Sequence, residues 1–584
     1  MEDDRISQLP IPILHNILCF ISQKETVRTC LLSKRWRHIG LTRPNLEFFE
    51  EWFDDKEEKF VHEGSTLPNL NSSSENLFNS TQEKFVPVVD RTLQRCRDQK
   101  RSILHRILSI LLCKGSTRHI LDSPEILFNT TQQNFVSVVN RTLQGYLDQN
   151  LSIHKLHLDL YSLDSQPVIS LLDKWIPIIS ALNIKAFELE FLSHTPAYYH
   201  LPSAVFLAES LEELHLCKCR LSPVESVRFK SLRKLTLEQV QVDGGTFDTK
   251  MLGCPLLRCL VLYSCWELRN VRVSEEASPG LKHFVLWNFM GIEGRSIKID
   301  VPNIETISIH GQWIWCHCQS AFLFSRLTSL DLDSVILSSE SFDLFSFGCP
   351  TLANLTLDNC SGFEEFHLAS DSVKWLSIKT HKIPLKGVTI CAPNIINFMF
   401  SGRIPQVPDT FSFATPTSKH WYSGVFLSSC DQYDPNFDAN SWFLELRRLL
   451  KALSGSKISL KMDGGPRDVP CSAVLGDEPP VVVWSLNFDA CKCRTVSWYL
   501  EFTNGLFRVF RPSHVWGGKL VSESDRKYYR FSEFQLNILL ANKKVELEGI
   551  HVDGQLVQWT DLSELRNRMY DKEIWLELKW RGGI

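Results

Sequence analysis

Two stretches decide the fold: LTSLDLDSVIL at residues 327–337 and LANLTLDNCSG at residues 352–362. Both begin with the spacing L-x-x-L-x-L, in which apolar and polar residues alternate as they do along a β-strand with one buried face. The two stretches start 25 residues apart, at Leu327 and Leu352. A segment this short cannot bury an apolar face alone, so we expect further copies stacked beside these two.

The same spacing, with Ile, Val or Phe accepted in place of Leu, recurs in both directions along the chain. Its first positions are Ile153, Ile184, Leu211, Leu232, Leu257, Leu281, Ile304, Leu327, Leu352, Val373 and Ile395. Most of the steps match leucine-rich repeats, in which each unit of about 20 to 29 residues adds one strand to a curved parallel sheet. Two extra matches, at 268–273 and 363–368, predict either very compact repeats or turns on the convex side.

Strand alternation places the polar positions of each repeat on the concave face of this solenoid. The candidate substrate-binding residues on that face are Glu238, Tyr263, Trp287, His310, Asp331, Asp333, Asp358 and Trp375. Acids outnumber bases on the face, and aromatic residues beside charges are typical of protein interfaces. We expect a protein partner that presents a basic or mixed segment; a solvated sheet face with incidental tryptophans is the alternative.

Residues 4–36, DRISQLPIPILHNILCFISQKETVRTCLLSKRW, predict a small helical module near the N-terminus. Apolar residues recur at helical spacing from Pro10 to Ile21, a second helix fits residues 24–31, and Ser33 is a good N-cap for a third segment. Helices this short are unstable alone, so they are expected to pack together and against a partner.

This stretch resembles the F-box of plant-type F-box/leucine-rich-repeat proteins. The residues in register with the family pattern are Asp4-Arg5-Ile6-Ser7, Leu9-Pro10, Ile17-Leu18, Val27-Arg28-Thr29 and Leu32-Ser33-Lys34-Arg35-Trp36. The resemblance implies that the segment docks a Skp-type adaptor and, through it, a cullin and a RING-type ubiquitin ligase. Ile11 departs from the pattern, because the family usually has Asp there, so a favourable helix N-terminal charge is lost.

The resemblance also implies a set of adaptor-binding residues. They are Ile6, Leu9, Pro10, Ile11, Ile13, Leu14, Ile17, Leu18, Val27, Leu32 and Trp36. Helical spacing does not separate the core of the module from its interface, so both roles stay open for each of these residues.

Residues 75–103 recur as residues 125–153 with 18 of 29 positions identical, which indicates a local duplication. In the resembled family one such helix joins the F-box to the first repeat. The second copy leads directly into a repeat strand and is the expected joint. The first copy is expected to be a looped or loosely packed insertion.

We therefore predict four domains. They are an F-box at 1–50, a helical hinge with the duplication at 51–150, leucine-rich repeats at 151–402 and a C-terminal capping or substrate region at 403–584. In the last region Ser441 predicts a helix start, 457–462 and 481–488 are strand-like, and 575–580 is rich in Trp. The expected fold class is an α+β or α/β repeat: a small helical F-box, a leucine-rich-repeat solenoid and a C-terminal α+β region.

Composition narrows the remaining possibilities. The 584 residues include 63 basic and 67 acidic side chains, so nucleic acid is not an expected partner. The charged first residues and the absence of a long apolar run predict no membrane and an intracellular location, in the nucleus and/or cytoplasm. The 18 cysteines show no zinc-ribbon spacing, so reduced thiols and no metal are expected; the alternative is a metal site at Cys316 and Cys318, which His310 and His317 flank.

No P-loop, dinucleotide-binding, zinc-protease or serine-hydrolase motif occurs, so we expect no catalytic residue and no cofactor. The leading interpretation is a non-catalytic substrate-recognition subunit of an SCF-type (Skp, cullin, F-box) E3 ubiquitin ligase, which captures a target protein and acts by proximity. One alternative is a small-molecule-sensing repeat receptor that uses the same ligase. The other is an adaptor-independent interaction scaffold.

Overall fold

The computed structural model describes residues 9–19, 26, 29, 33–50, 124–160, 166–179, 182–192, 198–221, 227–242, 247, 254–288, 294–316, 324–338, 348–380, 385–404, 408, 410–414, 421–428, 439–466, 478–489, 496–519, 545–552, 554–557 and 573–581. Two compact units are distinguished, Met1–Phe48 with Gly145–Ile584 and, separately, Phe49–Gln144. Among the described helices, none is both long and apolar enough to cross a bilayer.

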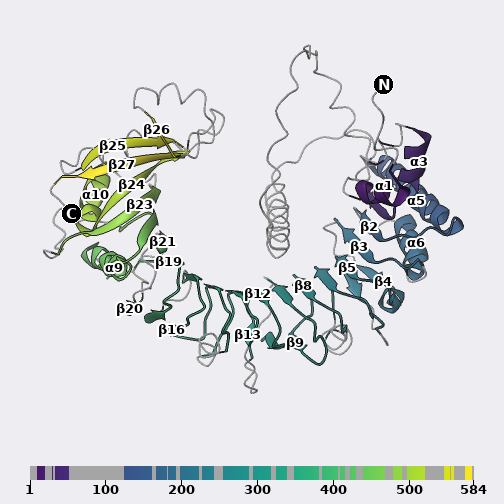
Figure 1. The fold of residues 1–584 in the computed structure, drawn as a ribbon, viewed down its shortest axis with the longest axis horizontal. Helices are drawn as coiled ribbons and strands as arrows, with labels where there is room; N and C mark the ends of the chain where they lie inside the picture. Colours follow the sequence, from purple (N-terminus) through teal and green to yellow (C-terminus); the bar gives the residue numbers. More distant parts are fainter. Residues whose placement is uncertain are drawn as a thin grey trace, which may run out of the picture. The chain divides into compact units, whose positions relative to one another are not determined.

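One long sheet forms the frame of the first unit, and its strands follow one another in sequence order (Figure 1). They are β1 (Asn45–Phe49), β2 (Lys155–Leu160), β3 (Ala186–Phe191), β5 (Glu213–Cys217), β7 (Lys234–Glu238), β8 (Cys259–Tyr263), β10 (His283–Trp287), β12 (Thr306–His310), β14 (Ser329–Asp333), β15 (Asn354–Asp358), β17 (Trp375–Lys379), β19 (Asn397–Arg403), β21 (Tyr422–Ser428), β22 (Lys457–Asp463), β23 (Val481–Asp489) and β24 (Phe510–Lys519). From β2 to β24 each strand pairs in parallel with the next. The strands from β2 to β19 each begin two residues after a predicted first position, so the predicted parallel solenoid is confirmed.

Leucine alternation explains the core of each repeat. Leu330 and Leu332 of β14 are buried, whereas Asp331 and Asp333 project from the other face of the strand. Because neighbouring repeats present the same pair in register, the buried side chains stack into one continuous core. Several strands are followed directly by a residue with positive φ, where the chain leaves the sheet: Lys218, Gln239, Ser264, Ser334 and Asn359.

Short secondary sheets lie across the core from the main sheet (Figure 1). They are β9 (Asn270–Ser274), β11 (Ser296–Asp300) and β13 (Ile314–Trp315); β16 (Glu365–Ala369), β18 (Gly387–Cys391) and β20 (Thr410–Phe413); and β4 (Tyr199–Leu201) with β6 (Cys219–Leu221). The extra matches at 268–273 and 363–368 are β9 and β16. They are strands, neither compact repeats of the main sheet nor simple turns, because a second strand of the same unit also needs alternating apolar residues. Helical segments occupy the early repeats: α6 (Gln166–Trp175) and two 3-10 turns, Ile176–Ile178 and Ser203–Leu207.

The main sheet runs across the predicted boundary at residue 402. β19 pairs with β21, and the parallel ladder continues to β24. There it becomes antiparallel, with β24 beside β27 (Glu573–Trp580), β27 beside β25 (Val545–Val552) and β25 beside β26 (Gln555–Val557). The C-terminal region therefore extends the same sheet, while the limits of the four domains stay a prediction.

Two helices accompany these last strands, α9 (Ala439–Ala452) and α10 (Val496–Val509). The predicted helix start at Ser441 is wrong by two residues, because α9 begins at Ala439 and Ser441 lies in its first turn. Trp442 of α9 packs against Phe502 of α10, with ring centroids 5.5 Å apart. The predicted strands at 457–462 and 481–488 are confirmed as β22 and β23, and the Trp-rich segment is β27.

Two helices of the predicted N-terminal module are described, α1 (Ile11–Leu18) and α3 (Lys34–Leu41). Ser33 caps α3 as predicted, because its hydroxyl accepts a hydrogen bond from the Trp36 amide at 3.2 Å. Thr26 and Thr29 are helical, while the rest of the predicted second helix, at 24–31, lies outside the described residues.

A joint connects this module to the first repeat. Tyr146, in the last turn of α5 (Pro124–Asp148), donates a hydrogen bond from its hydroxyl to the carbonyl of Arg43, and the His154 amide donates to the Pro44 carbonyl at 2.7 Å. β1, which follows directly after Pro44, pairs with β2. The second copy of the duplicated segment thus contributes a residue to the joint, whereas the first copy, at 75–103, lies outside the described residues.

Candidate interaction surfaces

The exposed side of α1 carries apolar side chains. Ile11, Ile13 and Ile17 are 42%, 45% and 39% exposed, and Pro10 is exposed beside them. Pro10, Ile13 and Ile17 are spaced three and four residues apart, so they form one row along the helix. We call these three residues the α1 row. An exposed apolar row on so small a module is typical of a surface that a partner covers.

The other described adaptor candidates belong to the core or pack against it. Leu14 and Leu18 are 0% and 1% exposed and form a cluster with Trp36 and Ile39, against which Leu9 packs. Of the two roles that the sequence left open, the structure places Leu14, Leu18 and Trp36 in the core. It places the α1 row and Ile11 on the surface. Ile6, Val27 and Leu32 lie outside the described residues.

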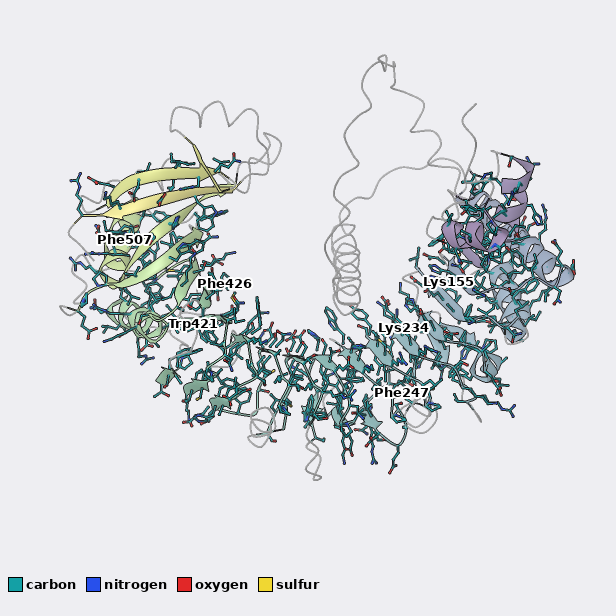
Figure 2. The ribbon with its side chains drawn as sticks, viewed as in Figure 1. Lys155, Lys234, Phe247, Trp421, Phe426 and Phe507 are labelled. Atoms are coloured by element: carbon teal, nitrogen blue, oxygen red, sulfur yellow. The ribbon has the colours of Figure 1, made fainter. Side chains whose placement is uncertain are left out.

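The second surface is the face of the main sheet opposite its buried leucines, which we call the open face. Lys155 on β2 and Phe426 on β21, both labelled in Figure 2, belong to its early and late strands. The predicted substrate-binding residues all occupy open-face positions of their strands: Glu238, Tyr263, Trp287, His310, Asp331, Asp333, Asp358 and Trp375. Their role in binding a substrate stays a prediction.

Carboxylates and imidazoles alternate at the N-terminal end of the open face. Glu188 lies 3.4 Å from Nδ1 of His157, and Glu190 lies 3.6 Å from Nε2 of the same ring. His215 continues the chain, with Nδ1 3.5 Å from Glu190 and Nε2 3.9 Å from Glu238. Parallel register brings these side chains together, because β2, β3, β5 and β7 are consecutive strands of the ladder.

These carboxylates change the titration of His157. Burial alone lowers its pKa, but the hydrogen bond to Glu190 and the charges of Glu188 and Glu190 outweigh burial and raise the pKa above its usual value. Lys155 opposes the increase and also forms a 2.9 Å salt bridge with Glu188. The acids at this end of the open face are therefore paired with bases of the same face.

An aromatic stack occupies the centre of the open face. Tyr263 meets Trp287 edge to face at a centroid distance of 5.3 Å, and Trp287 stacks on His310 at 4.7 Å. Nε2 of His310 lies 3.3 Å from Asp331, and its Nδ1 lies 3.5 Å from Asp333. One histidine thus links the stack to two of the predicted acids.

The acids of β14 and β15 are also engaged. Burial alone raises the pKa of Asp333, but hydrogen bonds from His310 and Ser334 and the charges of His310 and Lys379 lower it below its usual value. Asp358 accepts a 2.6 Å hydrogen bond from Nζ of Lys379. The acids predicted for this face therefore lie within ion-pair distance of neighbouring bases, which the sequence pattern could not show because the partners lie on other strands.

The early strands of the sheet also bring together three side chains of types that bind metal ions. His157, Asp159 and Glu190 each bring a ligand atom within 4.8 Å of the others, the one such grouping in the part of the chain that the structure describes. His157 and Glu190 already interact with each other, and no further feature of the described residues points to an ion, so we assign no metal. Of the predicted cysteine and histidine group, Cys316 is partly buried, while His317 and Cys318 lie outside the described residues.

Two buried thiols form hydrogen bonds to the backbone of the preceding repeat. Sγ of Cys265 donates to the carbonyl of Leu237 and Sγ of Cys360 to that of Leu332, each at 3.5 Å. Burial raises the pKa of each of these two thiols to about 12, so neither is a nucleophile at neutral pH. The predicted structural role of these cysteines is consistent with this burial.

The late strands of the open face expose large apolar side chains, four of which are aromatic or carry a thioether. Trp375, Met399, Tyr422 and Trp484 are 42%, 40%, 47% and 39% exposed. Sequence reasoning found only Trp375. Met399 was overlooked although it occupies an open-face position of β19, a predicted strand. Tyr422 and Trp484 were missed because the L-x-x-L-x-L spacing fails beyond β19: in β21 the small polar Ser423 occupies an inward position. The alternation of Val425 and Leu427 is the pattern that could have revealed this strand.

Comparison with known proteins identifies the architecture. An F-box domain model matches residues 6–47, and the model described as "FBD-associated F-box protein At5g56370, LRR repeats" matches residues 172–322. The chain carries an F-box and plant-type leucine-rich repeats. The two matches coincide with the helical module and with the early strands of the main sheet, so the resemblance predicted from the first residues is confirmed.

Relatives of this F-box/leucine-rich-repeat protein come from Arabidopsis thaliana. The chain is 21% identical to F-box/LRR-repeat protein At3g03360 over 381 residues, which are 64% of this chain and 61% of the relative. It is 25% identical to F-box/FBD/LRR-repeat protein At2g04230 over 322 residues, which are 53% of this chain and 54% of the relative. The chain therefore spans 54% to 61% of the length of these two relatives. No solved structure matches the chain.

Proposed function

We propose that this protein is the substrate-recognition subunit of an SCF-type E3 ubiquitin ligase. Its F-box binds a Skp-type adaptor and, through the adaptor, a cullin and a RING protein. The observation that carries the proposal is the α1 row, which stays exposed beside the buried cluster of Leu14, Leu18, Trp36 and Ile39. Burial of exposed apolar surface is the main driving force of most protein associations, so this row is the natural docking side of the module.

In this proposal the repeats and the C-terminal strands capture a target protein. The chain supplies no catalytic group of its own and acts by holding the target near the transfer enzymes, which raises their effective concentration. The proposal places the protein in the nucleus and/or cytoplasm, where such ligases work. The joint at Arg43 and Tyr146 supports it, because a firm connection between docking module and repeats would position a captured target.

Co-purification with a co-expressed Skp-type adaptor tests the proposal. The wild-type chain is expected to bring down the adaptor, and the double variant Ile13→Asp/Ile17→Asp is expected to lose it, because two carboxylates cannot be buried against an apolar partner without a large cost. The control is Leu444→Asp, which places the same charge on an equally exposed apolar site of α9 (48% exposed). Absence of adaptor from the wild-type sample, or full retention by the double variant, would refute the adaptor-docking role.

A further inference from the structure

The exposed apolar side chains of the late strands lie on one face. In β17, β19 and β21 the alternate residues are buried in the core, so Trp375, Met399 and Tyr422 project from the open face. Trp375 and Tyr422 share one row of the ladder, separated by Asn397. We call Trp375, Met399, Tyr422 and Trp484 the aromatic patch. It spans β17 to β23, which is roughly 19 Å at about 4.8 Å per strand spacing.

The ammonium group of Lys457 and the missing side chain of Gly424 organise the patch. Nζ of Lys457 lies 3.7 Å from the ring centroid of Trp484 and 5.5 Å from that of Tyr422, so one ammonium group sits by both rings. The side chain of Met399 occupies the space above Gly424, because a Cβ atom at Gly424 would lie 2.3 Å from the Met399 sulfur. The patch is therefore a set of positioned side chains and not a scatter of single exposed residues.

The charges beside the patch are mostly basic. Lys457 and Lys461 occupy open-face positions of β22, and within the described residues neither forms a salt bridge; Nζ of Lys461 lies 5.3 Å from the ring centroid of Phe426. Arg403, at the end of β19, keeps a buried Nε atom with no hydrogen-bond acceptor. Asp463 ends the same face of β22, and Asp489 is its register partner on β23, so three cations accompany two acidic positions on these described strands.

The balance of basic and acidic side chains around the aromatic patch is the reverse of that on the earlier strands. There, Glu188, Glu190, Asp331, Asp333 and Asp358 lie within ion-pair distance of histidines or lysines of the same face. A basic partner would have to displace those pairs, whereas an acidic partner finds cations around the aromatic patch without a carboxylate to displace. Tryptophan and tyrosine are also the residues most enriched among energetic hot spots of interfaces.

We infer that the aromatic patch is the docking site for a polypeptide segment in which apolar side chains alternate with carboxylates. The apolar side chains would cover Trp375, Met399, Tyr422 and Trp484, and the carboxylates would pair with Lys457, Lys461 and Arg403. This inference rests on the proposed function, because it names the chemistry of the target segment. It replaces the basic partner that the sequence pattern suggested.

The test is a selection of random 12-residue peptides displayed on phage against the full chain, followed by binding measurements on the synthesised winners. Enriched peptides are expected to combine Leu, Phe or Trp with Asp and Glu. Trp375→Ala and Trp484→Ala are each expected to weaken the best peptide by about tenfold or more, a typical hot-spot effect. Lys457→Glu is expected to weaken the acidic peptide and to favour its Lys-substituted version.

Leu444→Ala is the matched control, because it removes an exposed apolar side chain from α9, and circular dichroism of every variant checks the fold. Enrichment of basic peptides, binding that is indifferent to the patch variants, or no enrichment at all would overturn the inference. A patch variant that converts a dimer to a monomer in analytical ultracentrifugation would overturn it in favour of a second copy as occupant. Adaptor co-purification from the same preparations reports on the proposed function separately, so the two can fail independently.

Discussion

The hydroxyl of Tyr146 donates a 2.6 Å hydrogen bond to the main-chain carbonyl of Arg43, 103 residues earlier in the chain. Both residues are buried, and Nη1 of Arg43 donates in turn to Oγ1 of Thr26 at 2.9 Å. Burial raises the pKa of Tyr146 well above its usual value, although the charge of Arg43 opposes the increase, so the hydroxyl stays protonated and remains a donor. This contact ties the F-box to the start of the repeats.

Tyr146→Phe is expected to weaken that joint. The variant leaves the buried Arg43 carbonyl without its phenolic donor, which costs about 1 to 3 kcal/mol of unfolding free energy. Chemical denaturation followed by circular dichroism measures the loss, and amide hydrogen exchange is expected to rise at residues 43–46 and 154–156. Tyr422→Phe is the control, because Tyr422 is 47% exposed. Equal stability of the two variants would contradict the role given to Tyr146.

The duplicated segments differ at this position. The residue of the first copy that aligns with Tyr146 is Cys96, whose thiol is shorter and a much weaker donor. The first copy could not replace the second at the joint, which agrees with the expectation that the copy next to the first repeat strand does this work. Only the structure could assign the tyrosine its partner, because Arg43 lies far away in sequence.

Much of the fold was predictable because the repeat pattern is strong. Leu330 and Leu332 recur with the period of a strand and at the interval of a repeat, so position and register follow from spacing alone. The pattern weakens at β21, where Ser423 interrupts the apolar positions, and the predicted repeats therefore ended at residue 402. The sheet continues nevertheless, because backbone pairing with β19 and packing of Val425 and Leu427 suffice to hold the strand.

The candidate surfaces were predictable only in part. Ile13 and Leu14 are neighbours of similar hydrophobicity, so sequence could not tell that Leu14 is buried while Ile13 is exposed. Which of the two side chains is buried depends on how α1 packs against α3. Likewise, Asp358 reads as a free acid until Lys379 of the next strand is placed 2.6 Å from it.

The division of α1 into core and surface predicts a contrast between two variants. Leu14→Ala removes buried methyl groups and is expected to cost about 2 to 5 kcal/mol. Ile17→Ala removes an exposed side chain and is expected to change stability by no more than about 0.5 kcal/mol, while weakening adaptor binding. Thermal denaturation measures the first effect and adaptor titration the second. The opposite pattern, a stable Leu14→Ala and an unstable Ile17→Ala, would show that α1 is rotated.

The raised pKa of His157 predicts a pH-dependent stability. A group whose pKa is higher in the folded than in the unfolded chain stabilises the fold below its unfolded pKa, and this contribution is lost as pH rises through the folded value. His157→Gln is therefore expected to be more damaging at about pH 5.5 than at about pH 8.5. Urea denaturation at both values measures the difference. His200→Gln, at an exposed site of β4, is the control, and a loss that is independent of pH for His157→Gln would exclude the proposed charge interaction.

Alanine substitutions at Gly311 and at Gly294 are expected to differ in their cost to stability. The difference comes from how closely other atoms approach each glycine and not from its φ angle alone. Gly311 and Gly294 have φ of +115° and +77°, but a Cβ atom at Gly311 would lie 1.9 Å from the Asn288 carbonyl oxygen, whereas nothing lies within 4 Å of one at Gly294. Gly294→Ala is expected to cost only the left-handed conformation, about 1 to 2 kcal/mol. Gly311→Ala must also push away Asn288, whose amide bonds the His310 carbonyl, so a larger loss and a disturbed Trp287–His310 stack are expected. Denaturation midpoints of the two variants measure their stability. Equal losses of stability would contradict the prediction, because they would mean that the turn after β12 can move to accommodate the added methyl group.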